Sequence, residues 1–237
     1  MVAMSREEEL AERLQAVRER IAAAEQAAGR ESGSVRLLPV TKFHPASDIA
    51  TLRELGVTAV AENREQEARD KAAAVPDVDI HMIGQIQTKK ANSVARWAAC
   101  VHSVDSVRLA EALDRGMALA IERGDRPADE LPCLIQLSLD GDTSRGGVAA
   151  DGVDKLADFL ANADHLTFAG LMCVPPREWE ARAAFSQAAE VLHGLESRFG
   201  RTLEFSAGMS GDLAEAIACG STIVRVGTAI LGPRPLP

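Results

Sequence analysis

The sequence predicts an α/β fold, a single (β/α)8 TIM barrel with one extra helix at its amino-terminal end. Eight short β-branched or apolar runs alternate with Ala-rich amphipathic stretches along the chain. That alternation is typical of a parallel sheet covered by helices. The length of 237 residues also fits, because a barrel of this class has about 250 residues in one domain.

An open, doubly wound sheet is the competing arrangement. Such a sheet usually has a glycine-rich turn after its first strand, whereas here the first strand ends in Thr-Lys-Phe-His-Pro. Several runs are apolar at successive positions, as expected for strands buried on both faces. No linker, repeat or low-complexity segment divides the sequence. We therefore expect one barrel domain over residues 1–237, with residues 1–30 as a helix packed on it.

The elements follow in order from the amino-terminal helix. Ser5 and Glu8 form a capping box, apolar residues recur at helical spacing from Leu10 to Ile21, and Gly29 is a stop signal. Strands are predicted at Val35–Thr41, Thr58–Ala61, Ile80–Ile83, Cys100–Val104, Pro132–Leu137, Leu166–Met172, Leu203–Ser206 and Thr222–Val226. Helices are predicted at Ala46–Leu55, Asn63–Ala74, Thr88–Ala99, Ser106–Ile121, Asp151–Ala161, Trp179–Phe199 and Ser210–Ala218. The segment Asp140–Gly147 (DGDTSRGG) reads as a polar loop, and the tail after Gly232 as irregular.

The composition describes an acidic protein and excludes several function classes. Lys and Arg number 26 against 35 Asp and Glu, a net charge of −9, which argues against nucleic-acid and anionic-membrane binding. No apolar run approaches the roughly 20 residues of a membrane span. The start, MVAMSREEEL, is acidic and lacks an apolar signal core, so a cytoplasmic location is expected. The four cysteines form no CxxC pair and are expected to be buried free thiols.

In such a barrel the functional groups lie at the carboxyl ends of the strands, with phosphate sites often formed after strands 7 and 8. Lys42 ends the first strand, SAGMSG (206–211) follows the seventh, and RVGT (225–228) follows the eighth. Turns of this composition point backbone N–H groups at an anion. A lysine facing a phosphate site suggests a Schiff base to a phosphorylated aldehyde. The alternative, a lysine that simply extends into water at a strand end, remains open at this point.

Six segments carry a family resemblance: VTKFHP, AENREQE, IHMIGQIQTKK, GLMCVPP, SAGMSGD and GSTIVRVGTAILG. In their order and spacing, from about residue 35 to Arg234, the sequence resembles the pyridoxal phosphate homeostasis protein family, also known as the proline synthetase co-transcribed homologue family. The resemblance implies a barrel similar to the N-terminal domain of alanine racemase. It also implies pyridoxal 5′-phosphate as the cofactor.

The resemblance further implies a set of cofactor-binding residues. Lys42 would hold the cofactor as an internal aldimine, Arg225 would approach the pyridine nitrogen, and Met172 would pack on the ring or belong to the ordinary core. The other residues would lie near the ring or at the phosphate. The complete set is Lys42, Asn63, Met172, Ser206, Met209, Ser210, Arg225, Gly227 and Thr228.

The sequence contains no tyrosine. Alanine racemase needs a lysine and a tyrosine as opposed bases, so that mechanism is excluded, and His44 is the first candidate for a different second base. An arginine at the ring nitrogen would oppose its protonation and make the ring a poorer electron sink. We therefore expect no enzyme but a protein of cofactor homeostasis. The alternatives are a pyridoxal phosphate enzyme acting on an amino acid and, less favoured, a Schiff-base aldolase acting on a sugar phosphate.

The sequence also leads to expectations about binding partners and metal sites. The expected partners are pyridoxal phosphate and apo-forms of enzymes that use it, with the protein a monomer or weak dimer. No metal site is expected, because His102, His165 and His193 lie in separate segments without a carboxylate or cysteine at ligand spacing. His81 itself is expected in the core. The acidic run Glu62–Glu67 is interpreted as a solvated helix face, from which Glu62 alone could reach the cofactor.

Overall fold

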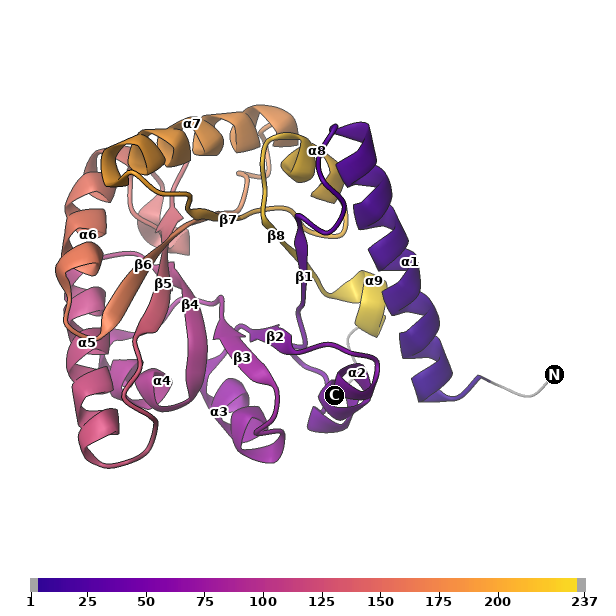
Figure 1. Ribbon diagram of the computed structural model, residues 1–237, viewed down its shortest axis with the longest axis horizontal. Helices are drawn as coiled ribbons and strands as arrows, with labels where there is room; N and C mark the ends of the chain where they lie inside the picture. Colours follow the sequence, from indigo (N-terminus) through magenta and orange to yellow (C-terminus); the bar gives the residue numbers. More distant parts are fainter. Residues whose placement is uncertain (1–3, 234–237) are drawn as a thin grey trace.

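Eight parallel strands form the sheet of the protein, whose computed structural model describes residues 4–233. Their order is β1-β8-β7-β6-β5-β4-β3-β2, and a bridge between Val40 and Ala61 links the two outer strands of that series. The sheet therefore curls into the predicted barrel (Figure 1). The strands are β1 (Arg36–Pro39), β2 (Ala59–Glu62), β3 (Asp79–Met82), β4 (Ala98–Val104), β5 (Leu131–Leu137), β6 (Leu166–Cys173), β7 (Glu204–Ser206) and β8 (Ile223–Val226).

Helices surround the barrel on its outer side (Figure 1). They are α1 (Arg6–Ala27), α2 (Ala46–Glu54), α3 (Glu65–Ala74), α4 (Ala91–Trp97), α5 (Val107–Glu122), α6 (Ala150–Asn162), α7 (Ala181–Phe199), α8 (Leu213–Ala218) and α9 (Thr228–Leu231), with 3-10 turns at Thr88–Lys90 and Thr143–Arg145. The amino-terminal helix begins with the predicted capping box between Ser5 and Glu8. Among residues 4–233, no helix is both long and apolar enough to cross a membrane.

All eight predicted strands are confirmed, each within two residues at either end. The helix predicted from Ser210 begins only at Leu213, because Asp212 closes a turn first: its Oδ1 accepts the Met209 N–H at 2.6 Å. The helix predicted to reach Ala99 ends at Trp97, since β4 already begins at Ala98. The short helix α9 was not predicted, and the tail beyond residue 233 lies outside the described residues.

The apolar core lies between the barrel and its helices, in two large groups. One group surrounds β4, β5 and β6 and includes the fully buried Phe168, Phe185 and Phe205. The other joins the apolar stripe of α1, from Leu10 to Ile21, to α2, α8 and β8. Burial of these side chains is the main favourable contribution to folding.

The interior of the barrel is partly polar. Leu38, Val40, Ala61 and Ile223 form one small apolar group, and Cys100, Leu134 and Met172 form another. Between them lie buried polar side chains of β4, β7 and β8, namely His102, Ser206 and Arg225. Three of the four cysteines are buried free thiols as expected, whereas Cys219 is only half-buried.

Candidate functional site

The residues singled out in the sequence lie at the carboxyl ends of strands. Lys42 follows β1 and Asn63 directly follows β2. Ser206 ends β7, where it is in register with Met172 of β6. Because all eight strands are parallel, these ends meet on one face of the barrel.

Arg225 of β8 is a buried cation. Its side chain is 4% exposed. Its Nη1 donates to Ser206 Oγ at 2.7 Å and its Nη2 to the Cys173 carbonyl oxygen at 2.9 Å. Within residues 4–233 no carboxylate lies at ion-pair distance from it, and burial lowers the pKa of the guanidinium. A buried charge without a counterion is costly, so this position favours an additional electron-rich acceptor.

The turn that carries Lys42 is fixed on both sides. Phe43 has a φ of 70°, and it is the one non-glycine residue between 4 and 233 with a positive φ. Its N–H donates to Glu67 Oε1 at 2.6 Å, while Lys71 Nζ donates to the Thr41 carbonyl oxygen at 2.8 Å. A left-handed conformation is costly for a bulky residue and persists only where contacts hold it. The half-buried Lys42 is thus placed by its two neighbours.

Glu62 packs against the outer side of this turn. The prediction that it belongs to a solvated helix face was wrong. Glu62 is fully buried, the last residue of β2, and its Oε1 accepts from Thr41 Oγ1 at 2.5 Å and from Lys71 Nζ at 2.6 Å. Strand alternation explains the error, because Ala61 faces the barrel interior and the next side chain faces α3. Burial raises the pKa of Glu62 despite the neighbouring ammonium. Glu62 therefore supports the Lys42 turn from outside the barrel.

His44, the candidate second base, also faces away from the barrel interior. It is buried, its Nδ1 lies 3.6 Å from Asp48 Oδ2, and it lines a small cleft with Arg6 of α1. Burial lowers the pKa of His44. Its contacts are those of a helix-packing residue.

Glycines allow close approaches around the site. A Cβ atom on Gly84 would lie 2.0 Å from the Asn63 carbonyl oxygen, so only glycine permits the loop after β3 to pass Asn63. Gly208 has a φ of 90°, and a Cβ there would lie 2.6 Å from Ala216 Cβ. The turn after β7 therefore packs directly onto α8. It leaves Met209 38% exposed.

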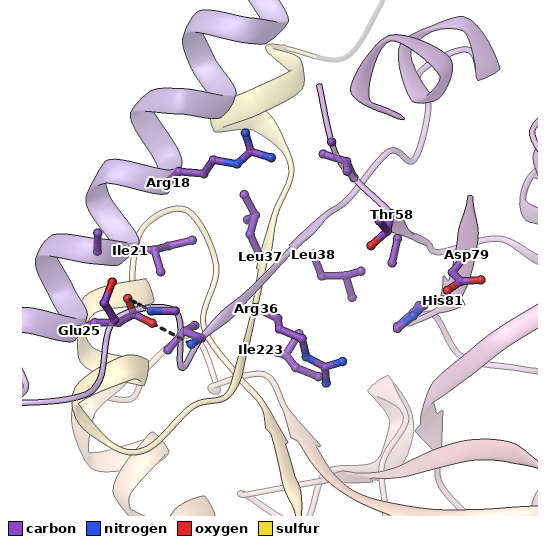
Figure 2. Close-up of a pocket in the computed structure, with 17 residues that line it drawn as sticks. Arg18, Ile21, Glu25, Arg36, Leu37, Leu38, Thr58, Asp79, His81 and Ile223 are labelled. Atoms are coloured by element: carbon purple, nitrogen blue, oxygen red, sulfur yellow. Dashed lines mark hydrogen bonds between the residues drawn. The ribbon is translucent and has the colours of Figure 1, made fainter. Parts of the chain in front are cut away.

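A cavity of about 510 Å³ lies at the opposite end of the barrel. It is lined by α1 and the amino-terminal parts of β1, β2 and β3, and Arg36, Asp79 and His81 contribute to its wall (Figure 2). No residue of the predicted cofactor set lines it. The cavity is thus separate from the carboxyl-end site.

The chain is similar to known proteins in both sequence and structure. Residues 13–235 match the family described as alanine racemase, N-terminal domain. The chain is 70% identical to a pyridoxal phosphate homeostasis protein of Corynebacterium glutamicum, over 87% of this chain and 94% of that protein. It is 45% identical to one of Mycobacterium tuberculosis, over 98% and 95%. The structure of PipY from Synechococcus elongatus with PLP bound superposes with a TM-score of 0.79, at 32% identity, covering 94% of this chain and 100% of that one.

Proposed function

Because the chain belongs to the pyridoxal phosphate homeostasis protein family, we propose that it holds pyridoxal 5′-phosphate at the carboxyl end of its barrel. The observation that carries the proposal is Arg225, a buried guanidinium without a carboxylate partner in the described part of the chain. Lys42 would bind the cofactor covalently through its amine. The protein would thereby keep a reactive aldehyde in reserve.

The side chains present fit this cofactor. Pyridoxal phosphate supplies an aldehyde that reacts with amines and a ring that withdraws electrons when its nitrogen is protonated. Arg225 can only donate hydrogen bonds and stays charged, so it would orient an unprotonated ring nitrogen and oppose its protonation. Such a ring is a weak electron sink, which suits storage better than carbanion chemistry.

The phosphate would lie at the turns after β7 and β8. Ser206 and Ser210 come from the first turn, and Gly227 and Thr228 from the second. Each turn leads into a short helix, and backbone N–H groups at such turns bind anions. Met209 belongs to the same turn, but its N–H already donates to Asp212, so it would shape the turn and not bind the phosphate through that group.

Two features favour storage over turnover. The sequence has no tyrosine, and His44 packs against Asp48 on the outside of the barrel. The second base of a racemase can therefore be neither a tyrosine nor His44. Asn63 and Met172 would border the ring. Delivery to apo-enzymes in the cytoplasm, by a monomer or weak dimer, belongs to the same proposal.

Borohydride trapping tests the covalent site. The protein is loaded with pyridoxal phosphate, followed by absorption, reduced with borohydride and mapped by peptide mass spectrometry. We expect one equivalent per chain, attached to Lys42, with the absorption band lost in Lys42→Ala and retained in Lys155→Ala, a control on the exposed side of α6. A modified lysine elsewhere, or an unchanged band in Lys42→Ala, would overturn the assignment.

A second measurement separates storage from catalysis. Amino acids carrying deuterium at the α carbon are incubated with the loaded protein, and loss of deuterium is followed by mass spectrometry. We expect no turnover that depends on Lys42. Multiple turnovers abolished by Lys42→Ala would instead establish an amino-acid enzyme.

A further inference from the structure

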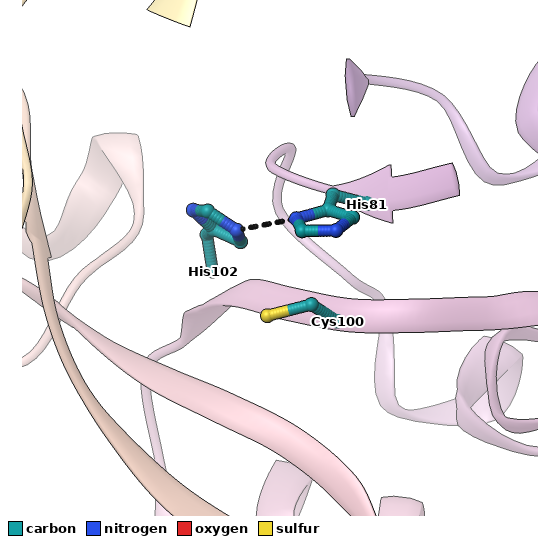
Figure 3. Close-up of side chains that lie close together, drawn as sticks. All are labelled: His81, Cys100 and His102. Atoms are coloured by element: carbon teal, nitrogen blue, oxygen red, sulfur yellow. Dashed lines mark hydrogen bonds between the residues drawn. The ribbon is translucent and has the colours of Figure 1, made fainter. Parts of the chain in front are cut away.

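Three side chains inside the barrel form a compact group that the cofactor proposal does not use. His81 comes from β3, and Cys100 and His102 come from β4 (Figure 3). One ligand atom from each lies within 4.8 Å of the others. We propose that His81, Cys100 and His102 bind a single Zn²⁺ ion in the interior of the barrel.

The sheet itself brings the three residues together. Cys100 and His102 are two positions apart on one strand, so their side chains point to the same face. His81 is in register with Cys100 on the neighbouring strand. No metal site was expected from the sequence, because no carboxylate or cysteine stood out at ligand spacing from His102, His165 or His193. The distance of 19 residues along the chain hides the proximity of His81 and Cys100, which the pairing of β3 with β4 brings about.

The donor set is one that zinc prefers. Two imidazole nitrogens and a thiolate suit a borderline-soft ion, whereas Mg²⁺ and Ca²⁺ require oxygen ligands. Tetrahedral zinc with Zn–N of about 2.0–2.1 Å and Zn–S of about 2.3 Å places its donor atoms ~3.3–3.7 Å apart. His81 Nδ1 and His102 Nε2 are 3.0 Å apart. Small rotations of the two rings and the thiol would produce the required spacing.

The unprotonated state of the two rings also favours metal binding. Burial lowers the pKa of His81 to about 4 and holds that of His102 well below its usual value, so both rings are neutral and retain a lone pair near neutral pH. Burial raises the pKa of the Cys100 thiol to about 12. Zinc binding therefore replaces the thiol proton, which is released to solvent. The resulting thiolate halves the added positive charge, and the nearby Arg36 is already paired with Glu204 at 2.5 Å.

A neighbouring hydroxyl can hold one of the two rings in place. Metal-bound histidines usually donate their other ring N–H to a fixed acceptor. His102 Nδ1 lies 2.9 Å from Ser206 Oγ, and that oxygen already accepts from Arg225. With zinc on Nε2, the Nδ1 proton would be directed to Ser206. The metal would thus fix one tautomer of a ring that is otherwise free to adopt two.

The cavity beneath α1 offers a route to the group at His81, the one of the three residues that lines it. His81 forms part of the wall of the cavity beneath α1 (Figure 2). A hydrated ion can reach His81 through this space, and a water molecule can occupy the remaining coordination position. Three protein ligands and one open position is a common arrangement for zinc.

The competing interpretation is a hydrogen-bonded pair of core histidines beside an uninvolved thiol. Cobalt substitution separates the two, because thiolate-bound Co²⁺ has a charge-transfer absorption band that Co²⁺ bound only by nitrogen and oxygen lacks. Chelator-treated, reduced full-length protein is titrated with Co²⁺ and then with Zn²⁺. We expect one equivalent of Co²⁺ with a thiolate band, displaced by Zn²⁺. We expect Cys100→Ser to abolish the band and His102→Gln to weaken Zn²⁺ binding at least tenfold.

Control variants test whether the effects on metal binding are specific to the three residues. Cys219→Ser and His193→Gln alter a half-buried and an exposed residue outside the group, and both should keep the band and the affinity. His81→Gln provides a third ligand variant should Cys100→Ser prove unfolded by circular dichroism. A wild-type titration without a thiolate band overturns the proposal. So does a band that survives in Cys100→Ser, or Zn²⁺ affinity unchanged in both histidine variants.

Discussion

The two halves of the barrel wall are held in place differently. β4, β5 and β6 are seven, seven and eight residues long and rest on the larger apolar group. β8, β1 and β2 have four residues each, and charged groups are buried beside them, among them Glu25, Glu62 and Lys71. The residues proposed to hold the cofactor, Lys42 and Arg225 above all, belong to this second half. Apolar packing supports both halves, and buried charged contacts additionally position the second.

Removing a large apolar side chain from the first half should affect stability alone. Phe185 of α7 is fully buried, and Phe185→Ala should lower the free energy of unfolding by about 4 kcal/mol through lost burial and a cavity. Urea unfolding measures this change. The dissociation constant for pyridoxal phosphate of the folded fraction should not change. Phe159→Ala, at the half-buried edge of the same group, is the control and should cost less. A loss of affinity without a loss of stability would contradict the division of the wall.

The elements that depend on apolar periodicity could be predicted from the sequence. The capping box at Ser5 and all eight strands were predicted, because burial on one or both faces leaves a pattern along the chain. The charged contacts leave no such pattern. Glu62 looked like part of a solvated acidic run, and its partner Lys71 lies nine residues away on another element. The pairing of His81 with Cys100 depends on strand register, which no local spacing encodes.

Acid should destabilise the fold through two histidines, His81 on β3 and His102 on β4. Above pH 6.5 His81 is neutral in the folded and unfolded states. Between pH 6.5 and 4 the unfolded chain binds a proton that the folded protein, with its His81 pKa of about 4, does not. The free energy of unfolding should therefore fall by about 3 kcal/mol across this range, and His102, whose pKa is also lowered, adds in the same direction.

Chemical unfolding of metal-free protein at a series of pH values measures that slope. His81→Gln should flatten it, while His193→Gln, with an exposed side chain, should leave it unchanged. An identical slope in His81→Gln would mean that other groups govern the acid sensitivity.

Replacing Lys71 should disturb the second half and the cofactor site together. Removing one partner of a buried ion pair typically costs about 3–5 kcal/mol. Lys71→Met should cost less, about 2 kcal/mol, because burial has already raised the pKa of Glu62 and the carboxyl can take up a proton. The lost bond to the Thr41 carbonyl oxygen should also loosen the Lys42 turn.

A weaker affinity for pyridoxal phosphate is therefore expected in Lys71→Met, measured by absorption titration. Adding Glu62→Gln should restore part of the stability, since no unpaired carboxylate would then be buried at the end of β2, but not the affinity. Equal affinities in wild type and Lys71→Met would show that the turn does not depend on this contact.

The smallest effect should come from Thr41, whose hydroxyl donates to Glu62 Oε1 at 2.5 Å. Thr41→Val keeps the shape of the side chain and removes one buried hydrogen bond, so the free energy of unfolding should fall by about 1 kcal/mol. The bond from Lys71 to the Thr41 backbone remains, so the affinity for pyridoxal phosphate should stay close to that of wild type. Thr51→Val, which removes an exposed hydroxyl bond within α2, is the matched control and should have almost no effect. If Thr41→Val reduced the affinity as much as Lys71→Met, the Thr41 hydroxyl and not the backbone contact would position Lys42.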